Sequence, residues 1–206
     1  MSRLAALLGG LFSLWIAVAS PLAGMDHQFL TAHMAQHLLL MTVAAPLLLL
    51  SAPAMILPRN VFHPAICWLA GTSVVFGWHV PALFELGMRS AGWHAFEHAT
   101  FFIAGLMFWW PVIQPKVCPR WGIPIYLFLA TLPCDALSAF LTFCGRVVYP
   151  HYLSAHGLFD ISPLADQACA GALMWTWVTF VYLAPAAAIT LRMLSPQRRA
   201  WNVEAA

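Results

Sequence analysis

The sequence predicts an all-α, polytopic membrane bundle of about six transmembrane helices. Of its 206 residues, 62% are hydrophobic and only 8% are charged, whereas soluble domains carry about 25% charged residues. The mean hydropathy is +0.81, and the apolar stretches run for about 20 residues or more, the length that crosses a bilayer as a helix. Barrel strands would instead alternate apolar and polar residues. The lipid bilayer is therefore the expected environment, and we expect residues 1–206 to form one integral membrane domain.

The apolar stretches divide the chain into six expected spans. They cover approximately residues 4–20, 29–57, 62–86, 93–113, 124–144 and 166–194. Pro46 and Pro53 predict a kink or an early end in the second span. The first span has features of a signal peptide, since Arg3 precedes a short apolar core. Pro21 is a poor context for cleavage, so we expect this span to be retained.

Lysine and arginine predict the orientation of the bundle. With the N-terminus inside the cell, the outer loops hold only Arg89 and Arg146. The inner loops and tails then hold Arg3, Arg59, Lys116, Arg120, Arg192, Arg198 and Arg199. Because cytoplasmic loops carry an excess of basic residues, both termini are expected to be cytoplasmic. The net charge of +2 gives no reason to expect nucleic acid as a partner.

Eight of the nine histidines gather near the outer ends of the expected spans. They are His27, His33, His37, His79, His94, His98, His151 and His156. Only His63 falls on the inner side. Polar groups inside a membrane are costly and mark functional sites, so this layer is the first place to look for function.

Two of the histidine-containing segments repeat one spacing, His-x-x-x-His, in HMAQH (33–37) and HAFEH (94–98). Residues four apart lie on one face of a helix, so two such faces turned toward each other would bring four imidazoles together. His79 could add a fifth, and Met34 is expected at the same depth. Imidazole binds zinc, copper and iron, and thioether sulfur favours Cu(I). The predicted metal ligands are therefore His33, His37, His94 and His98, with His79 as an additional ligand.

A simpler interpretation applies to part of this set. A single histidine near a helix end is often an interfacial anchor or a packing residue, and His27, His151 and His156 fit that description. Methionine is also a common packing residue. The paired histidines are harder to explain in this way, because the same spacing occurs twice at one expected depth.

Four further polar residues fall within or beside the spans. Asp135 lies near the middle of the fifth span, where an ionisable group is a functional candidate, or else a protonated or paired side chain. Asp166 and Gln167 begin the sixth span. Asp166 either favours the positive N-terminus of that helix or orients a ligand histidine by accepting its second N–H. Glu97 points about 100° away from His98, so it need not share the site.

Several segments carry a family resemblance over roughly residues 30–185. They are HMAQHLLLM with the following AAPLLLL, WHVPALFELGMRS, HAFEHATFFIAGLMFWWPV, LTFCGRVVYPHY and SPLADQACAGALMW. In these segments the chain resembles the CtaG-type cytochrome c oxidase assembly factors associated with caa-type oxidases.

The resemblance implies a non-enzymatic role in maturing a haem–copper oxidase, at the step where copper reaches the catalytic subunit. Its partners would be that subunit and other assembly factors, and its location the bacterial inner membrane with the histidines facing outward. The residues that match the family's motifs are His33, His37, His79, His94, His98, Asp166 and Gln167. We expect the histidines to hold copper, supported by Asp166, Gln167, Met34 and Asp135.

Three alternatives remain open from the sequence. A haem-binding membrane cytochrome would use histidines of facing helices as axial ligands. A membrane metalloenzyme would use the His-x-x-x-His boxes for iron, although such enzymes often carry adjacent histidine pairs, which this chain lacks. A transporter would use Asp135 as a proton relay.

Overall fold

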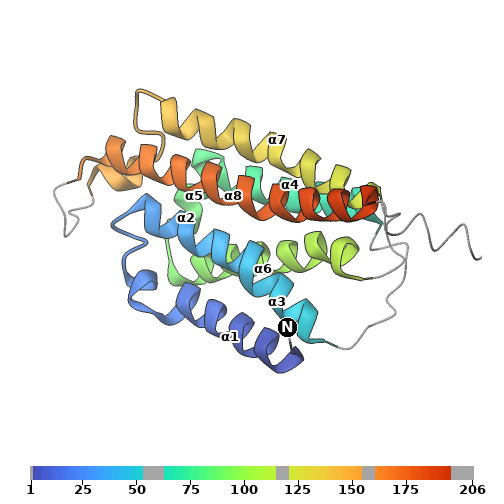
Figure 1. The fold of residues 1–206 in the computed structure, drawn as a ribbon. Coiled ribbons are helices and arrows are strands. Elements are labelled where there is room, and N and C mark those ends of the chain that lie inside the picture. The colour runs from blue at the N-terminus through green and yellow to red at the C-terminus, as the bar shows by residue number, and fades with distance from the viewer. Residues whose placement is uncertain (1, 53–62, 115–120, 155–160, 196–206) are drawn as a thin grey trace, which may run out of the picture.

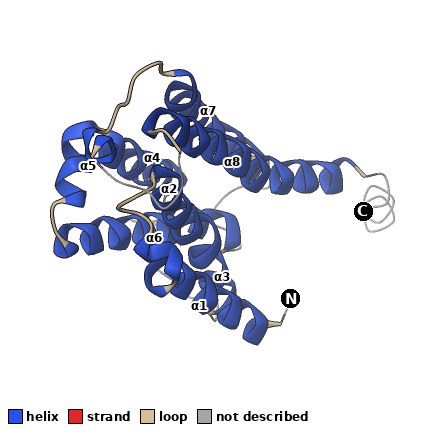
Figure 2. Cartoon of the chain, turned by 90° about the vertical axis from the view of Figure 1, so that its left-hand side faces the viewer, coloured by secondary structure: helices blue, strands red, loops and turns tan. Residues whose placement is uncertain are grey.

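The computed structural model describes residues 2–52, 63–114, 121–154 and 161–195. Within these ranges all regular secondary structure is helical (Figures 1 and 2). The α-helices are α1 (Arg3–Ala19), α2 (Leu30–Leu38), α3 (Ala45–Ser51), α4 (Pro64–His79), α5 (Pro81–Met88), α6 (Ala91–Ile113), α7 (Gly122–Phe143) and α8 (Pro163–Leu194). A π-helical segment (Leu39–Ala44) joins α2 to α3, and short 3₁₀ turns occupy Pro21–Gly24 and Pro150–Leu153.

The all-α membrane fold predicted from composition is confirmed. Five helical stretches in the described part of the chain are long and apolar enough to cross a membrane, and α4 with α5 makes a sixth if the bent pair counts as one span. The helix ends agree with the expected spans to within a few residues, apart from a break at Pro81. The predicted end of the second span, with Pro53, lies outside the described residues.

The third expected span is broken rather than continuous. The chain leaves helical geometry at Val80, and α5 is bent by 77° from α4. Pro81 explains the break, because proline has no N–H for the helical ladder and disfavours the helical conformation of the residue before it. Residues 81–88 therefore fold across the end of the bundle instead of extending α4 (Figure 1).

Pro46 changes the second span without ending it. The helix widens to a π-helical segment one turn before this proline, and such bulges commonly accompany kinks. The carbonyl of Met41 in this turn accepts a hydrogen bond from the indole N–H of Trp109 at 3.0 Å. Helix α6 thus satisfies a polar backbone group at the widened turn, as a lipid environment requires.

One end of the bundle, which we call the histidine end, gathers the starts of α2, α6 and α8 and the finishes of α1, α4 and α7 (left in Figure 1). Three hydrogen bonds tie these termini together. The Gln36 amide donates to the carbonyl of Ala17 at 2.9 Å, and the Tyr149 hydroxyl donates to that of His79 at 3.1 Å. The backbone N–H of Val148 donates to the Gln167 side chain at 2.7 Å.

Close packing of α6 against the π-helical segment depends on Gly105. A Cβ added there would lie 2.7 Å from the Met41 carbonyl oxygen and 2.8 Å from its Cα, both backbone atoms. We expect Gly105→Ala to lower the free energy of unfolding by about 1–3 kcal/mol, the usual range for overpacking. Thermal unfolding of the detergent-solubilised protein measures this.

Gly77→Ala is the matched control, because a Cβ at Gly77 meets nothing within 4 Å. Replacing a helical glycine in open space removes a propensity cost of up to about 1 kcal/mol. Equal effects of the two substitutions would contradict the packing described for Gly105.

Candidate metal centre

The two His-x-x-x-His faces meet inside the bundle. Within each pair the ring centroids are close, at 4.3 Å for His33 and His37 on α2 and 4.2 Å for His94 and His98 on α6. Between the helices, His33 lies 5.4 Å from His94 and His37 lies 5.6 Å from His98. His33, His37 and His98 are buried, and His94 is partly exposed. Four imidazoles therefore share one small volume at the histidine end.

Glu97 also belongs to this volume, although its angle to His98 did not require it. Its side chain is completely buried, and its Oε1 lies 3.4 Å from Nε2 of both His33 and His37. The carboxylate of α6 thus contacts both paired histidines of α2. The relevant spacing is the one to His94, since residues three apart also share a helix face. That spacing was the signal in the sequence that could have identified Glu97.

Helix α5 covers Glu97, and Gly87 allows it to do so. A Cβ on Gly87 would lie 2.5 Å from Oε2 of Glu97. Aromatic rings enclose the neighbouring imidazoles, because Phe101 stacks on His37 at 3.8 Å and Phe84 packs against His33 at 4.9 Å. The bend at Pro81 therefore has a consequence at the site, since it brings α5 over the carboxylate.

A second group of donors lies between the cluster and the surface. Oδ2 of Asp26 lies 3.5 Å from Nε2 of His94, and the rings of His94 and His151 are 5.4 Å and 5.8 Å from that of His27. The Tyr152 hydroxyl donates to the carbonyl of Asp26 at 2.8 Å. Burial raises the pKa of Tyr152 well above its ordinary value, so this phenol stays a neutral donor.

Two sets of three donors have metal-site dimensions, and His94 belongs to both. Within each set, Asp26–His27–His94 and His33–His94–Glu97, one ligand atom per residue lies within 4.8 Å of the others. Several ring nitrogens, including Nδ1 of His33 and Nε2 of His98, have no hydrogen-bond partner among the residues that the structure describes. Imidazole nitrogens that have no hydrogen-bond partner and lie next to carboxylates can act as ligands for zinc, copper or iron.

Comparison with protein families agrees with the resemblance found in the sequence motifs. The family model described as cytochrome c oxidase caa3 assembly factor (Caa3_CtaG) matches residues 1–195. The chain belongs to this family. No curated protein and no solved structure matches it. The family description ties the chain to assembly of cytochrome c oxidase and implies a non-catalytic role.

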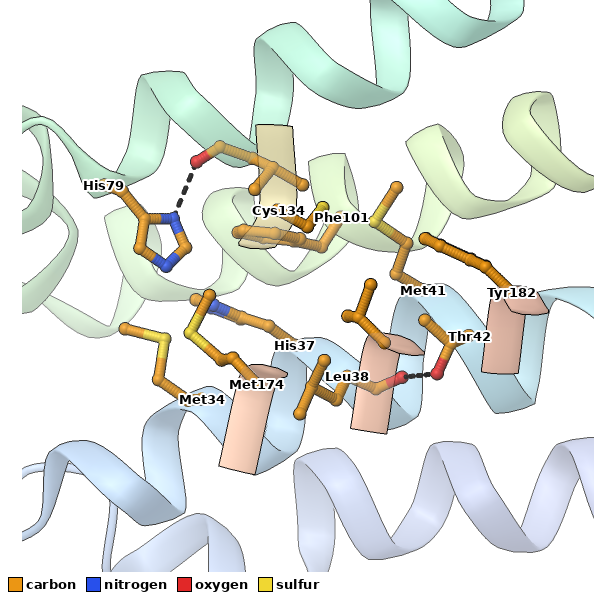
Figure 3. Close-up of a pocket in the computed structure, with 12 residues that line it drawn as sticks. Met34, His37, Leu38, Met41, Thr42, His79, Phe101, Cys134, Met174 and Tyr182 are labelled. Atoms are coloured by element: carbon orange, nitrogen blue, oxygen red, sulfur yellow. Dashed lines mark hydrogen bonds between the residues drawn. The ribbon is translucent and has the colours of Figure 1, made fainter. Parts of the chain in front are cut away.

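In this assembly factor His79 lies apart from the two donor sets. Its Nδ1–H donates to the carbonyl of Val75 at 2.6 Å, which leaves Nε2 as the free nitrogen. His79, His37 and Met34 line a small cavity beneath the cluster (Figure 3). The structure thus brings four of the five predicted ligands together and directs the fifth into a neighbouring space.

Asp166 positions the histidine-bearing helix α2. It accepts hydrogen bonds from the backbone N–H groups of Leu30 at 2.5 Å and Thr31 at 3.2 Å, and from the Thr31 hydroxyl at 2.6 Å. These bonds cap the first turn of α2 rather than orient a histidine ring. Gln167 is completely buried, and it holds the loop after α7 through the N–H of Val148 and the carbonyl of Arg146.

Asp135 and His63 lie away from the cluster. Asp135 is half-buried on α7 and belongs to neither donor set, although its buried Oδ1 has no hydrogen-bond partner within the described chain. His63 caps α4 by accepting from the N–H of Ala65. His156 lies outside the described residues.

A groove leads from the surface to the cluster. Its volume is about 420 Å³, and it runs between α1, the turn after α1, α2 and α6. Asp26, His27, His94 and His98 line it, among mostly apolar side chains. A small cation thus has a route past the exposed His27 to the buried histidines.

The capping role of Asp166 predicts a loss of stability that a simple helix-dipole role does not. We expect Asp166→Ala to lower the free energy of unfolding by about 2 kcal/mol, because several hydrogen bonds to a charged group are lost. Asp166→Asn, which keeps one acceptor oxygen, should lose about half as much. Thermal unfolding in detergent compares them.

Ser162→Ala is the control, since exposed Ser162 caps α8, the helix that carries Asp166, by accepting from the N–H of Ala165. Its loss should be about 1 kcal/mol or less. If Asp166→Ala costs no more than Ser162→Ala, the bond to α2 does not stabilise the bundle.

Proposed function

We propose that this assembly factor carries copper as cargo in the cluster formed by His33, His37, His94, His98 and Glu97, for delivery to the catalytic subunit of cytochrome c oxidase. The observation that supports this most is the meeting of two His-x-x-x-His faces around a completely buried carboxylate. Imidazole is a ligand that copper accepts readily, and the family description places the protein in oxidase assembly.

The charge of Glu97 gives a physical reason for a cation in the cluster. An ionised carboxylate inside a membrane protein costs several kcal/mol unless it is compensated. Its neighbours at Oε1 are two imidazole nitrogens, so either a shared proton or a bound cation offsets the charge. Copper binding would replace that proton, which couples cargo binding to proton release.

The arrangement suits transfer better than permanent binding. Cargo would first meet Asp26, His27 and His94 in the groove and then pass inward by ligand exchange, because His94 belongs to both donor sets. A site intended for release keeps its coordination incomplete, unlike a closed structural site. The mixed carboxylate and imidazole donors provide labile ligands for this purpose.

We also propose that the histidine end faces outward across the bacterial inner membrane. Seven basic residues against two support this orientation. Copper would then enter from outside and reach the oxidase subunit at the same depth in the bilayer. Other assembly factors would supply the copper or hold the subunit during the transfer.

One observation favours a second candidate function. His33, His94 and Glu97 are two histidines and one carboxylate, the ligand set of non-haem iron enzymes. In that case the purified protein would retain iron rather than copper. A haem-binding cytochrome would instead show a Soret band.

Metal analysis of the detergent-purified protein tests the proposal. We expect about one copper per chain in the cluster, and a loss of affinity of at least about tenfold in His33→Ala/His94→Ala, since ligand-shell substitutions commonly cost 10–100-fold. Cells carrying this variant should assemble oxidase with less copper. His63→Ala, at the start of α4, is the control and should change neither the copper affinity nor the copper content of the oxidase.

Iron or haem in the wild-type protein would identify the second candidate or the cytochrome. Full copper content of the oxidase in the double variant would contradict the copper-carrying proposal.

A further inference from the structure

The small cavity beneath the cluster is unusually rich in sulfur. It has a volume of about 30 Å³ and lies among α2, the π-helical segment, α4, α6, α7 and α8 (Figure 3). The chemistry-bearing side chains along its wall are Met34, Met41, Met174, Cys134, His37 and His79. None of the three methionines or the cysteine belongs to the donor sets of the cluster.

His79 directs a free nitrogen into this space. The Val75 carbonyl can only accept, so Nδ1 of His79 carries the proton at the 2.6 Å contact, and Nε2 carries the lone pair. That Nε2 is buried and has no hydrogen-bond partner among the described residues. Figure 3 shows it turned toward the side chains of Met34 and Met174, which extend up from the opposite wall.

The size and lining of the cavity favour an ion over a water molecule. About 30 Å³ accommodates one small species, and an ordered water needs two to four polar partners. The Thr42 hydroxyl already donates to the Leu38 carbonyl at 2.6 Å and accepts from the Trp177 indole at 2.8 Å. The polar groups left for a water are then the histidine nitrogens, the Tyr182 hydroxyl and the weakly polar Cys134 thiol. A soft cation can also use the sulfur atoms.

We propose that this cavity is a separate Cu(I) site, with Nε2 of His79 and the thioether sulfurs of Met34 and Met174 as its ligands. Imidazole and thioether are neutral, and thioether selects Cu(I) over harder divalent ions. A single positive charge surrounded by neutral ligands also costs less in a low-dielectric interior than a double one. The site binds Cu(I) without any change of oxidation state.

This inference rests on the proposed function only for the identity of the cargo. His37 borders both the cavity and the cluster, so copper can pass between them by ligand exchange. The ring of His79 also borders a second hollow. His79 lines a second groove of about 320 Å³, together with Pro81, Phe140 and Arg146.

The test uses the full-length protein in detergent, titrated anaerobically with Cu(I) against a competing chelator and examined by copper X-ray absorption. We expect about two Cu(I) ions per wild-type chain, of which one has sulfur neighbours. Met34→Leu/Met174→Leu should lose the sulfur-bound ion and keep the other. These substitutions nearly conserve volume, so they cost little stability. His79→Ala should weaken the same ion.

Two variants separate this site from the cluster. His33→Ala/His94→Ala should keep the sulfur-bound Cu(I), and Met107→Leu, outside the cavity lining, should bind as the wild type does. Sulfur scattering that persists in Met34→Leu/Met174→Leu, or a sulfur-bound ion lost with the cluster variant, would overturn the inference. Wild-type protein that binds the sulfur-bound Cu(I) but no copper at nitrogen and oxygen ligands would instead overturn the proposed function.

Discussion

A buried carboxylate between two imidazoles is the constraint on which the histidine end depends. Glu97 cannot be hydrated, and its Oε1 faces Nε2 of His33 and of His37. In a membrane interior such a group must be compensated by its neighbours. Removing one partner of a buried charged pair costs about 3–5 kcal/mol, so the relative positions of α2 and α6 are tied to this contact. The cluster therefore holds α2 and α6 together and is also a candidate metal centre.

Helix α8, helix α5 and the loop after α7 fix the position of this contact between α2 and α6. Asp166 of α8 fixes the first turn of α2, and the glycine at 87 lets α5 close over the carboxylate. Tyr149 stacks on Phe84 at 4.1 Å and bonds to the carbonyl of His79, which connects the loop after α7 to α4 and α5. Burial raises the pKa of Tyr149, so its hydroxyl stays protonated for this bond. Ligand positions set by rigid elements are what a binding site requires.

The sequence predicted the helical spans, apart from the break at Pro81, and the two histidine pairs, because apolar length and the four-residue spacing are local properties. It did not identify Glu97, since the 100° offset from His98 hid the three-residue spacing to His94 and the reach of a long side chain. It predicted His79 as an additional ligand of the cluster, whereas in the structure this ring bonds to the Val75 carbonyl and lines the cavity below. The bond from Asp166 to α2 joins residues 136 positions apart, and no local pattern predicts such a contact.

The claim that underlies this account is that α2 and α6 hold one ion against Glu97. Anomalous diffraction at the copper edge, from crystals of the full-length protein loaded with copper, tests it most directly. We expect a peak between α2 and α6, within bonding distance of a Glu97 carboxylate oxygen and of Nε2 of His33 or His94. Peaks confined to His27, His151 and other histidines outside the cluster, with none beside Glu97, would contradict it.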